Sequence, residues 1–322
     1  MNWQWRTVNR RDIHLNVATL GSGPLVLMVH GFPELARSWR HQLRPVAQAG
    51  FTAAAMDVRG YGGSAKPRDV EAYAIDELVE DMAAVMDELG DGSAIVVGHD
   101  WGAAIAQSAC LLAPDRIRGV VSLSAPTLPY SEHRPSDVAG ALAGDGFFYQ
   151  NYFLQPGVAE QELEADVERF LKLFYWGLSG DARDRLLPVR RASGSKLLLG
   201  PLEDAGPQMS RWLSDTDFAE LVTAFQNGGL TGPLNRYRAQ DLDWEILRPH
   251  ASDLIAAPGL FIAGTLDPVR DLVPGVDLYA DPVARFADPR GVHFLEGVGH
   301  WTAEEAPADV NRILVPFLTS LK

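Results

Sequence analysis

Apolar residues in the first part of the chain follow two alternating patterns. The runs at 25–29 and 94–97 contain only apolar side chains, which is typical of strands buried on both faces of a parallel sheet. Between such runs, apolar positions at helical spacing predict helices near 38–49, 73–89 and 102–113. Because strands and helices alternate, we expect a parallel sheet with right-handed crossovers. Further strands are predicted at 12–19, 51–57 and 120–124.

This alternation stops after residue 126 and resumes near residue 245. Residues 127–244 carry aromatic clusters and several short helical patterns, with few strand-like runs. Two buried strands, each followed by a loop, are then predicted within 258–268 and 292–301, and a closing helix at 307–321. The sequence therefore predicts a core domain made of residues 1–126 and 245–322, interrupted by a mainly helical domain at 127–244.

Composition narrows the class of protein. The chain has 322 residues, 47% of them hydrophobic, which is enough for a large core. A net charge of −14 disfavours binding to nucleic acid or to anionic membranes. The first residues lack the apolar segment of a signal peptide, and no run is long enough to span a membrane, so we expect a cytoplasmic protein. The single cysteine, Cys110, lies in an apolar helical pattern and is interpreted as a core residue.

A candidate nucleophile lies in the segment Gly98-His99-Asp100-Trp101-Gly102, between a predicted strand and a predicted helix. Small residues two positions before and after the central residue permit a sharp turn, which in serine hydrolases carries the nucleophilic serine. Here an aspartate, Asp100, takes that place. The simpler alternative is that Asp100 only caps the following helix.

Two backbone N–H groups are candidates for an oxyanion hole. The segment His30-Gly31-Phe32-Pro33 follows the first buried strand, and hydrolases with such a nucleophile turn have one N–H donor in a loop at this place. Trp101 follows the candidate nucleophile and would provide the second N–H. Paired donors of this kind stabilise a tetrahedral intermediate by several kcal/mol. The Phe32–Pro33 peptide bond is a candidate for the cis form, and the alternative is a loop that only packs.

An acid and a base follow late in the chain, in the order nucleophile, acid, base. Asp267 follows the predicted strand within 258–268, and His300 follows the next strand, after a glycine. Asp267 is expected to orient and stabilise the imidazole of His300, with Asp271 as the alternative acid. No Cys/His cluster has the spacing of metal ligands, so no metal and no cofactor are predicted.

A carboxylate nucleophile implies a particular chemistry. It can displace a leaving group from a saturated carbon and form an ester with the enzyme, which water must then hydrolyse. His300 would activate that water. Substrates should therefore carry a strained or good leaving group on carbon, such as an epoxide or a halide.

With these motifs in place, the chain resembles the α/β-hydrolase-fold epoxide hydrolases, and is similar to the hydrolase domain of the soluble epoxide hydrolases. HGFPE, DVRGYGGS, GHDWGA, GTLDP and GHW occur in the family's order over nearly the whole chain. The resemblance implies an α/β fold with a mostly parallel eight-stranded sheet flanked by helices and an inserted helical cap. It further implies that two cap tyrosines, Tyr149 in FFYQ and Tyr237 in NRYR, protonate the epoxide oxygen as the ring opens to a vicinal diol. Tyr152 lies three residues from Tyr149 and is the alternative for that position.

The remaining expectations concern substrate, partners and rival functions. Phe147, Phe153 and Trp176 either line an apolar pocket or only pack. The expected ligands are a small apolar epoxide and water, and the expected assembly is a monomer or homodimer, with a role such as detoxification. One alternative is a haloalkane dehalogenase, but Phe32 occupies the position where such enzymes commonly have a halide-binding Asn. The other alternative is a binding protein without turnover.

Overall fold

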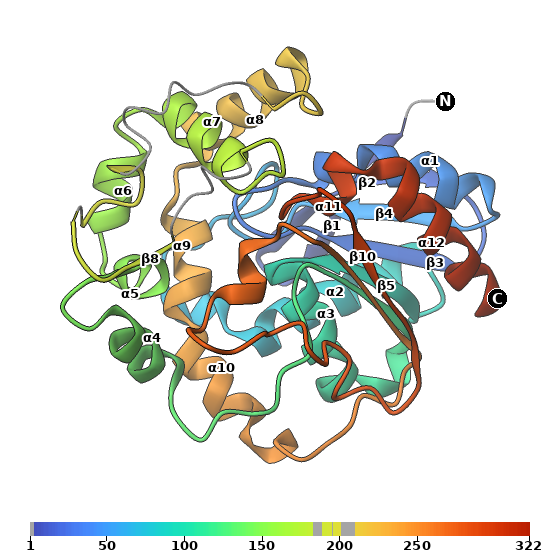
Figure 1. Cartoon of the computed structure of the whole chain (residues 1–322). Helices are drawn as coiled ribbons and strands as arrows, with labels where there is room; N and C mark the ends of the chain where they lie inside the picture. Colours follow the sequence, from blue (N-terminus) through green and yellow to red (C-terminus); the bar gives the residue numbers. More distant parts are fainter. Residues whose placement is uncertain (1–2, 183–188, 195, 201–209) are drawn as a thin grey trace.

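The computed structural model describes residues 3–182, 189–194, 196–200 and 210–322. Within them, eight strands form one sheet in the order β1-β2-β4-β3-β5-β6-β9-β10 (Figure 1). The strand β2 pairs antiparallel with β1 and β4, and every other neighbouring pair is parallel. The strands are β1 (Gln4–Arg10), β2 (Ile13–Gly21), β3 (Leu25–Val29), β4 (Thr52–Met56), β5 (Ala94–His99), β6 (Ile117–Leu123), β9 (Gly259–Gly264) and β10 (Pro289–Leu295).

The all-apolar central strands separate two hydrophobic layers. In β3, Leu25 and Leu27 belong to the core cluster on one face, and Val26 and Met28 belong to the cluster on the other. This division follows from the alternation of side chains along a strand. A strand in this position must be apolar at every residue, which confirms the interpretation of the continuous run at 25–29.

Helices cover both faces of the sheet. Helices α2 (Ile75–Leu89) and α3 (Trp101–Leu112) pack on one face, and α1 (Arg40–Gln48) and α12 (Pro307–Ser320) pack on the other (Figure 1). The short helices η1 (Ala36–Trp39), η2 (Val70–Tyr73), η3 (Pro114–Arg116), η6 (Arg248–His250), η7 (Pro268–Asp271) and α11 (Thr302–Glu305) complete the core. Among the described residues, no helix is long and apolar enough to cross a membrane.

The two edges of the sheet differ from the sequence prediction. The edge strand β1 was not predicted, because six of its seven residues are at least partly exposed and only Val8 is buried. At the opposite edge, β10 is a strand as expected, but only Leu295 of its residues is buried. The prediction of a buried strand there is wrong, because an edge strand has no neighbour to cover its outer side.

The segment between β6 and β9 is mainly helical, and Figure 1 shows most of its helices gathered beyond one end of the sheet. We call residues 127–244 the helical insertion. In the described part of this insertion the helices are α4 (Pro135–Ala143), α5 (Tyr149–Phe153), α6 (Val158–Leu163), α7 (Val167–Gly177), α8 (Asp215–Gly228), α9 (Thr231–Arg238) and α10 (Gln240–Leu247). One short antiparallel pair, β7 (Phe147–Phe148) with β8 (Arg190–Arg191), also lies in it. Helix α10 extends three residues past position 244.

Candidate active site

Asp100 lies at a strained turn between β5 and α3. Its backbone has φ 52° and ψ −122°, a region that non-glycine residues rarely adopt. The turn requires the flanking glycines, because a Cβ on Gly98 would lie 2.3 Å from the carbonyl oxygen of Gly102, and one on Gly102 would lie 2.0 Å from that of Val29. The Asp100 side chain makes no capping hydrogen bond to helix α3. The Asp100 carboxylate therefore does not cap the N-terminus of α3, and the turn directs it away from the helix.

The loop after β3 approaches this carboxylate from one side. The backbone N–H of Phe32 donates a hydrogen bond to Asp100 Oδ1 at 2.9 Å. The Phe32–Pro33 peptide bond is cis, as the sequence predicts. Trp101 is the first residue of α3, so its N–H belongs to the first helical turn, where no carbonyl of the same helix can accept it. Both N–H groups predicted for an oxyanion hole thus belong to residues beside Asp100.

His300 lies between the two aspartates. Its Nδ1 is 3.0 Å from Asp267 Oδ1, and its Nε2 is 3.6 Å from Asp100 Oδ2. Asp267 is held by the hydroxyl of Tyr279 at 2.8 Å and by the N–H of Val269 at 3.0 Å. The structure thus brings together the three side chains that the sequence analysis selected, from the turns that follow β5, β9 and β10.

Charge determines the protonation of this group. Burial alone would lower the pKa of His300, but the carboxylates of Asp267 and Asp100 outweigh it and raise that pKa well above its usual value. Burial would likewise raise the pKa of Asp100, yet the positive charge on the nearby His300 lowers it. Both shifts favour a protonated His300 beside an ionised Asp100.

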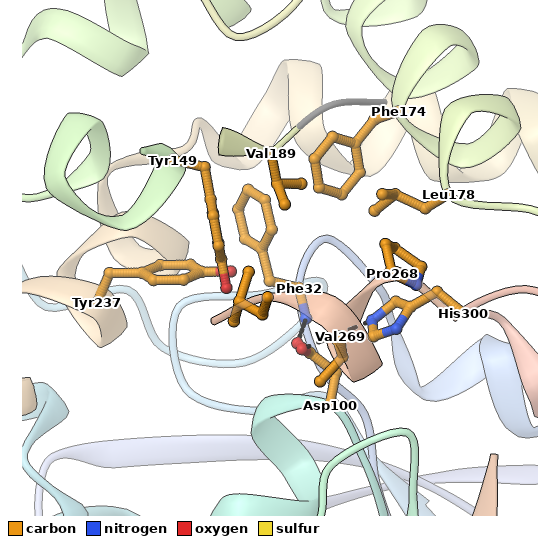
Figure 2. A pocket seen from close by; sticks show the side chains of 11 residues that line it. Phe32, Asp100, Tyr149, Phe174, Leu178, Val189, Tyr237, Pro268, Val269 and His300 are labelled. Atoms are coloured by element: carbon orange, nitrogen blue, oxygen red, sulfur yellow. Dashed lines mark hydrogen bonds and ion pairs between the residues drawn. The ribbon is translucent and has the colours of Figure 1, made fainter. Parts of the chain in front are cut away.

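An apolar cavity opens above Asp100, with about 420 Å³ of empty space that includes its opening to solvent (Figure 2). In Figure 2 the hydroxyls of Tyr149 and Tyr237 come together inside it, on the side away from His300. Burial is the main cause that raises the pKa of both phenols, and the nearby Asp100 charge adds to it, so both stay protonated. The lining residues are Phe32, Asp100, Tyr149, Phe174, Leu178, Val189, Tyr237, Pro268, Val269, Leu272 and His300.

Other predicted residues lie elsewhere. Tyr152, the alternative to Tyr149, donates its hydroxyl to Glu162 at 2.5 Å. Asp271, the alternative acid, is exposed in η7. Phe147, Phe153 and Trp176 do not line this cavity, and the structure corrects that expectation.

The first two of these aromatics have identified packing partners. The ring of Phe147 packs against Tyr152 and under the guanidinium of Arg191. Phe153 is fully buried behind the two tyrosines and the ring of Phe32, with ring centroids 4.8 to 5.7 Å apart.

The lining that the sequence analysis missed comes mostly from α7, η7 and the residue that follows each of them. Phe174 and Leu178 are four residues apart, so they share one helix face, and this spacing was the available signal. Pro268, Val269 and Leu272 follow Asp267 directly, so their place beside the acid was also accessible from the sequence. Among the described residues, no group of His, Cys, Asp and Glu side chains is arranged to hold a metal ion.

Comparison with known proteins agrees with this geometry. A family model described as the alpha/beta hydrolase fold matches residues 24–307. The chain is 38% identical to a Mycobacterium tuberculosis protein named epoxide hydrolase A, over 98% of both chains. The chain belongs to the epoxide hydrolase family.

This family member is also similar to solved structures, two of which are named as epoxide hydrolases. One is an epoxide hydrolase from an endophytic Streptomyces, with 42% identity, coverage of 99% of this chain and 96% of that one, and a TM-score of 0.92. The other is epoxide hydrolase A from Mycobacterium thermoresistibile, with 36% identity, coverage of 100% and 99%, and a TM-score of 0.90.

In this epoxide hydrolase family member, a buried ion pair between His99 and Glu34 contacts the backbone of His300. His99 Nδ1 lies 2.6 Å from Glu34 Oε2, and His99 Nε2 lies 2.8 Å from the backbone carbonyl of His300. Since the carbonyl can only accept, Nε2 must donate. Burial opposes a charge on His99, but Glu34 outweighs it and raises the pKa of His99, while His99 lowers that of Glu34. The sequence analysis missed this pair, although both residues lie inside motifs that it used.

Proposed function

We propose that this protein is an epoxide hydrolase that converts epoxides to vicinal diols through an ester on Asp100. One observation carries the proposal: a carboxylate at a strained turn faces two protonated phenols across an apolar cavity, beside a His–Asp pair. The names of the similar proteins support it. The helical insertion supplies both phenols and would act as the cap over the core.

Ring opening needs a nucleophile and an acid on opposite sides of the epoxide. Asp100 Oδ2, which receives no hydrogen bond from Phe32, would attack one ring carbon. The C–O bond breaks, its electron pair goes to the oxygen, and Tyr149 or Tyr237 gives that oxygen a proton. A phenol with a raised pKa is fully protonated at neutral pH, as a general acid must be.

Formation of the ester would change His300 from a cation into a base. Before attack, two carboxylates hold the proton on His300. Esterification removes the charge of Asp100, so the pKa of His300 should fall. His300 then gives its proton to the tyrosinate left by ring opening. The neutral imidazole can take a proton from water, while Asp267 remains to orient it and stabilise its cation.

Hydrolysis of the ester would use the N–H groups beside Asp100. Phe32 already holds Asp100 Oδ1 at 2.9 Å, and this oxygen becomes the ester carbonyl. When water attacks the carboxyl carbon, negative charge develops on that oxygen. The N–H groups of Phe32 and Trp101 would stabilise it, and loss of one such donor usually costs about 3 kcal/mol.

The cavity also indicates the class of substrate. Apart from Asp100, His300 and the two tyrosines, its lining side chains are apolar. A charged substituent would lose its hydration there without a partner. We therefore propose small, uncharged, apolar epoxides, with water as the second substrate.

Intact-mass measurement on the His300→Gln variant tests this function. Without its base, the variant should attack styrene oxide but not complete hydrolysis, so it should gain the mass of one whole epoxide. The double variant His300→Gln/Asp100→Asn is the control and should gain nothing. A butyl adduct from 1-bromobutane with no adduct from the epoxide would instead indicate a dehalogenase. No adduct with either probe would contradict ester formation on Asp100.

A further inference from the structure

A buried arginine lies next to the proposed acid Tyr237. Arg236 belongs to α9 and is 2% exposed. It forms an ion pair with Asp243 in α10 and donates to the backbone carbonyl of Tyr73 in the core. Asp243 in turn accepts the N–H of Ile75, at the start of α2, at 2.8 Å. The pair therefore fixes the helix that carries Tyr237 to the core.

Arg236 also reaches the turn that carries the proposed nucleophile. Its guanidinium carbon lies 4.7 Å from the centre of the Trp101 ring. The Trp101 ring packs edge to face on Tyr237, with centroids 5.1 Å apart and planes at 86°. A continuous set of contacts thus runs from the cation through Trp101 to the phenol.

The cost of burying this cation indicates a role beyond packing. A buried ion pair is often no more stabilising than apolar side chains of similar size. Arg236 Nε and Nη2, moreover, make no hydrogen bond among the described residues, although Nη2 belongs to the ion pair with Asp243. Burial lowers the pKa of Arg236 to about 9, which leaves it charged at neutral pH.

The charges on Arg236 and Tyr237 interact. A negative charge on Tyr237 raises the pKa of Arg236. Because such coupling is reciprocal, the cation must lower the pKa of Tyr237. It opposes burial and the charges of Asp100, Tyr149 and Tyr61, all of which raise the pKa of this phenol.

We propose that Arg236 is a positioning residue for ring opening, which holds Tyr237 over Asp100 and stabilises the phenolate formed when Tyr237 gives up its proton. The inference rests on the proposed function. In that step Asp100 becomes a neutral ester, the alkoxide takes the phenol proton, and the negative charge moves to Tyr237. The proton that His300 holds before attack passes to this tyrosinate, which restores the phenol and leaves the imidazole neutral. His300 then regains a proton from the attacking water, so the overall reaction adds one water to the epoxide.

A spectroscopic test does not depend on turnover. 3-Nitrotyrosine placed at position 237 absorbs visible light when ionised, so its pKa can be measured directly. Arg236→Met should raise that pKa by about one unit or more, and Arg236→Lys should keep most of the wild-type value. The matched control is Arg238→Met on the same helix, because Arg238 pairs with Glu160 inside the insertion and should leave the pKa unchanged. Arg236→Gln is the second neutral variant should Arg236→Met not fold. An unchanged pKa in a folded neutral variant would overturn the proposal.

Single-turnover kinetics with styrene oxide then separate positioning from general stability. Arg236→Met should slow ester formation by up to about tenfold, no more than loss of the Tyr237 hydroxyl would, and leave ester hydrolysis nearly unchanged. Arg236→Lys should restore part of the lost rate. Equal losses in both steps would indicate a structural role only and contradict the proposal. If the wild-type protein forms no ester, the proposed function fails, whereas the nitrotyrosine measurement still decides whether Arg236 acts on Tyr237.

Discussion

At the scale of single residues, the site is a set of charges that control one another. Asp100 and Asp267 hold a proton on His300, and Glu34 holds one on His99. The rings of His99 and His300 lie 4.9 Å apart, so each cation lowers the pKa of the other. Changing one carboxylate should therefore be detected in the titration of its neighbours.

The two phenols should partly replace one another. Tyr149→Phe or Tyr237→Phe alone should slow ester formation about tenfold, because the other hydroxyl can still protonate the oxygen. The double variant should lose about a thousandfold, within the usual range for removal of a general acid. Single-turnover mass spectrometry measures this step. Tyr152→Phe is the control, since its hydroxyl binds Glu162, and a loss there equal to that of Tyr149→Phe would reverse the assignment.

Glu34→Gln should change both stability and pH dependence. The lowered pKa of Glu34 stabilises the fold above pH about 4.5, and this contribution is lost as the pH falls through its folded pKa. The raised pKa of His99 stabilises the fold fully below pH about 6.5, and that contribution is lost as the pH rises through its folded pKa. Urea unfolding should therefore show the largest loss, about 3 kcal/mol, between these pH values.

The Glu34→Gln substitution should also shift the acid limb of the pH–rate profile for ester hydrolysis to higher pH. With His99 neutral, His300 loses a like charge and its pKa rises, so a higher pH is needed to free the base. Glu304→Gln is the matched control, because Glu304 is equally buried but pairs with Arg40. It should cost stability without moving the limb, and a limb that stays in place in Glu34→Gln would contradict the coupling.

Sequence reasoning found the residues that belong to short motifs and missed those that do not. Asp100, Asp267 and His300 each lie in the turn that follows a predicted strand, so their place at one edge of a parallel sheet could be predicted. Phe153 could not be placed, because a buried aromatic in a short helix gives no sign of whether it faces a cavity or lies behind it. The charge on His99 depends on a contact with Glu34 across 65 residues, which no local pattern encodes.

At the scale of elements, the turn from β5 to α3 depends on close backbone contacts. Gly102→Ala places a methyl group 2.0 Å from the Val29 carbonyl oxygen, so β3 and α3 would have to separate. We expect a loss of at least 3 kcal/mol in the free energy of unfolding, in the range of severe overpacking. Gly140→Ala is the control, since a Cβ at this helical position meets nothing within 4 Å, and it should be neutral or stabilise by up to about 1 kcal/mol. Thermal unfolding of both variants checks this, and equal stability would show that the turn tolerates a side chain.

Strands with buried side chains could be predicted from the sequence more easily than strands with exposed side chains. The run at 25–29 became β3 without adjustment, because each of its side chains faces a hydrophobic layer. The edge strand β1 pairs with β2 through its backbone and buries only Val8, so its pattern of side chains carries little information.

At the scale of the whole molecule, the helical insertion is joined to the core partly through charges. Asp217 in α8 binds Arg37 at 2.7 Å and Arg40 at 3.2 Å, and Arg40 binds the buried Glu304. Asp243 and Arg236 make a second connection on another side of the insertion. Because both tyrosines belong to the insertion, these connections help to fix the acids relative to the nucleophile.

Asp217→Asn should loosen the first connection. We expect a loss of about 1 kcal/mol and a fall in Tm of about 2 °C, because the pairs are partly exposed. The difference from wild type should shrink at high salt, which screens exposed charges. Asp215→Asn is the control, since Asp215 lies in the same first turn of α8, is exposed and forms no ion pair among the described residues. Equal melting temperatures for the two variants would show that the connection does not stabilise the protein.

The hydrogen bond from Phe32 to Asp100 makes the two carboxylate oxygens unequal. If Oδ1 stays in the oxyanion hole while Oδ2 attacks, the oxygen given to the diol is always the one that faces the substrate. Water then refills only that position. During many turnovers in ¹⁸O-labelled water, Asp100 should accumulate one heavy oxygen and never two, and peptide mass spectrometry can count them. Two labels would mean that the carboxylate rotates between turnovers. The isotope count would therefore show whether one backbone N–H holds the Asp100 side chain in place for longer than a turnover.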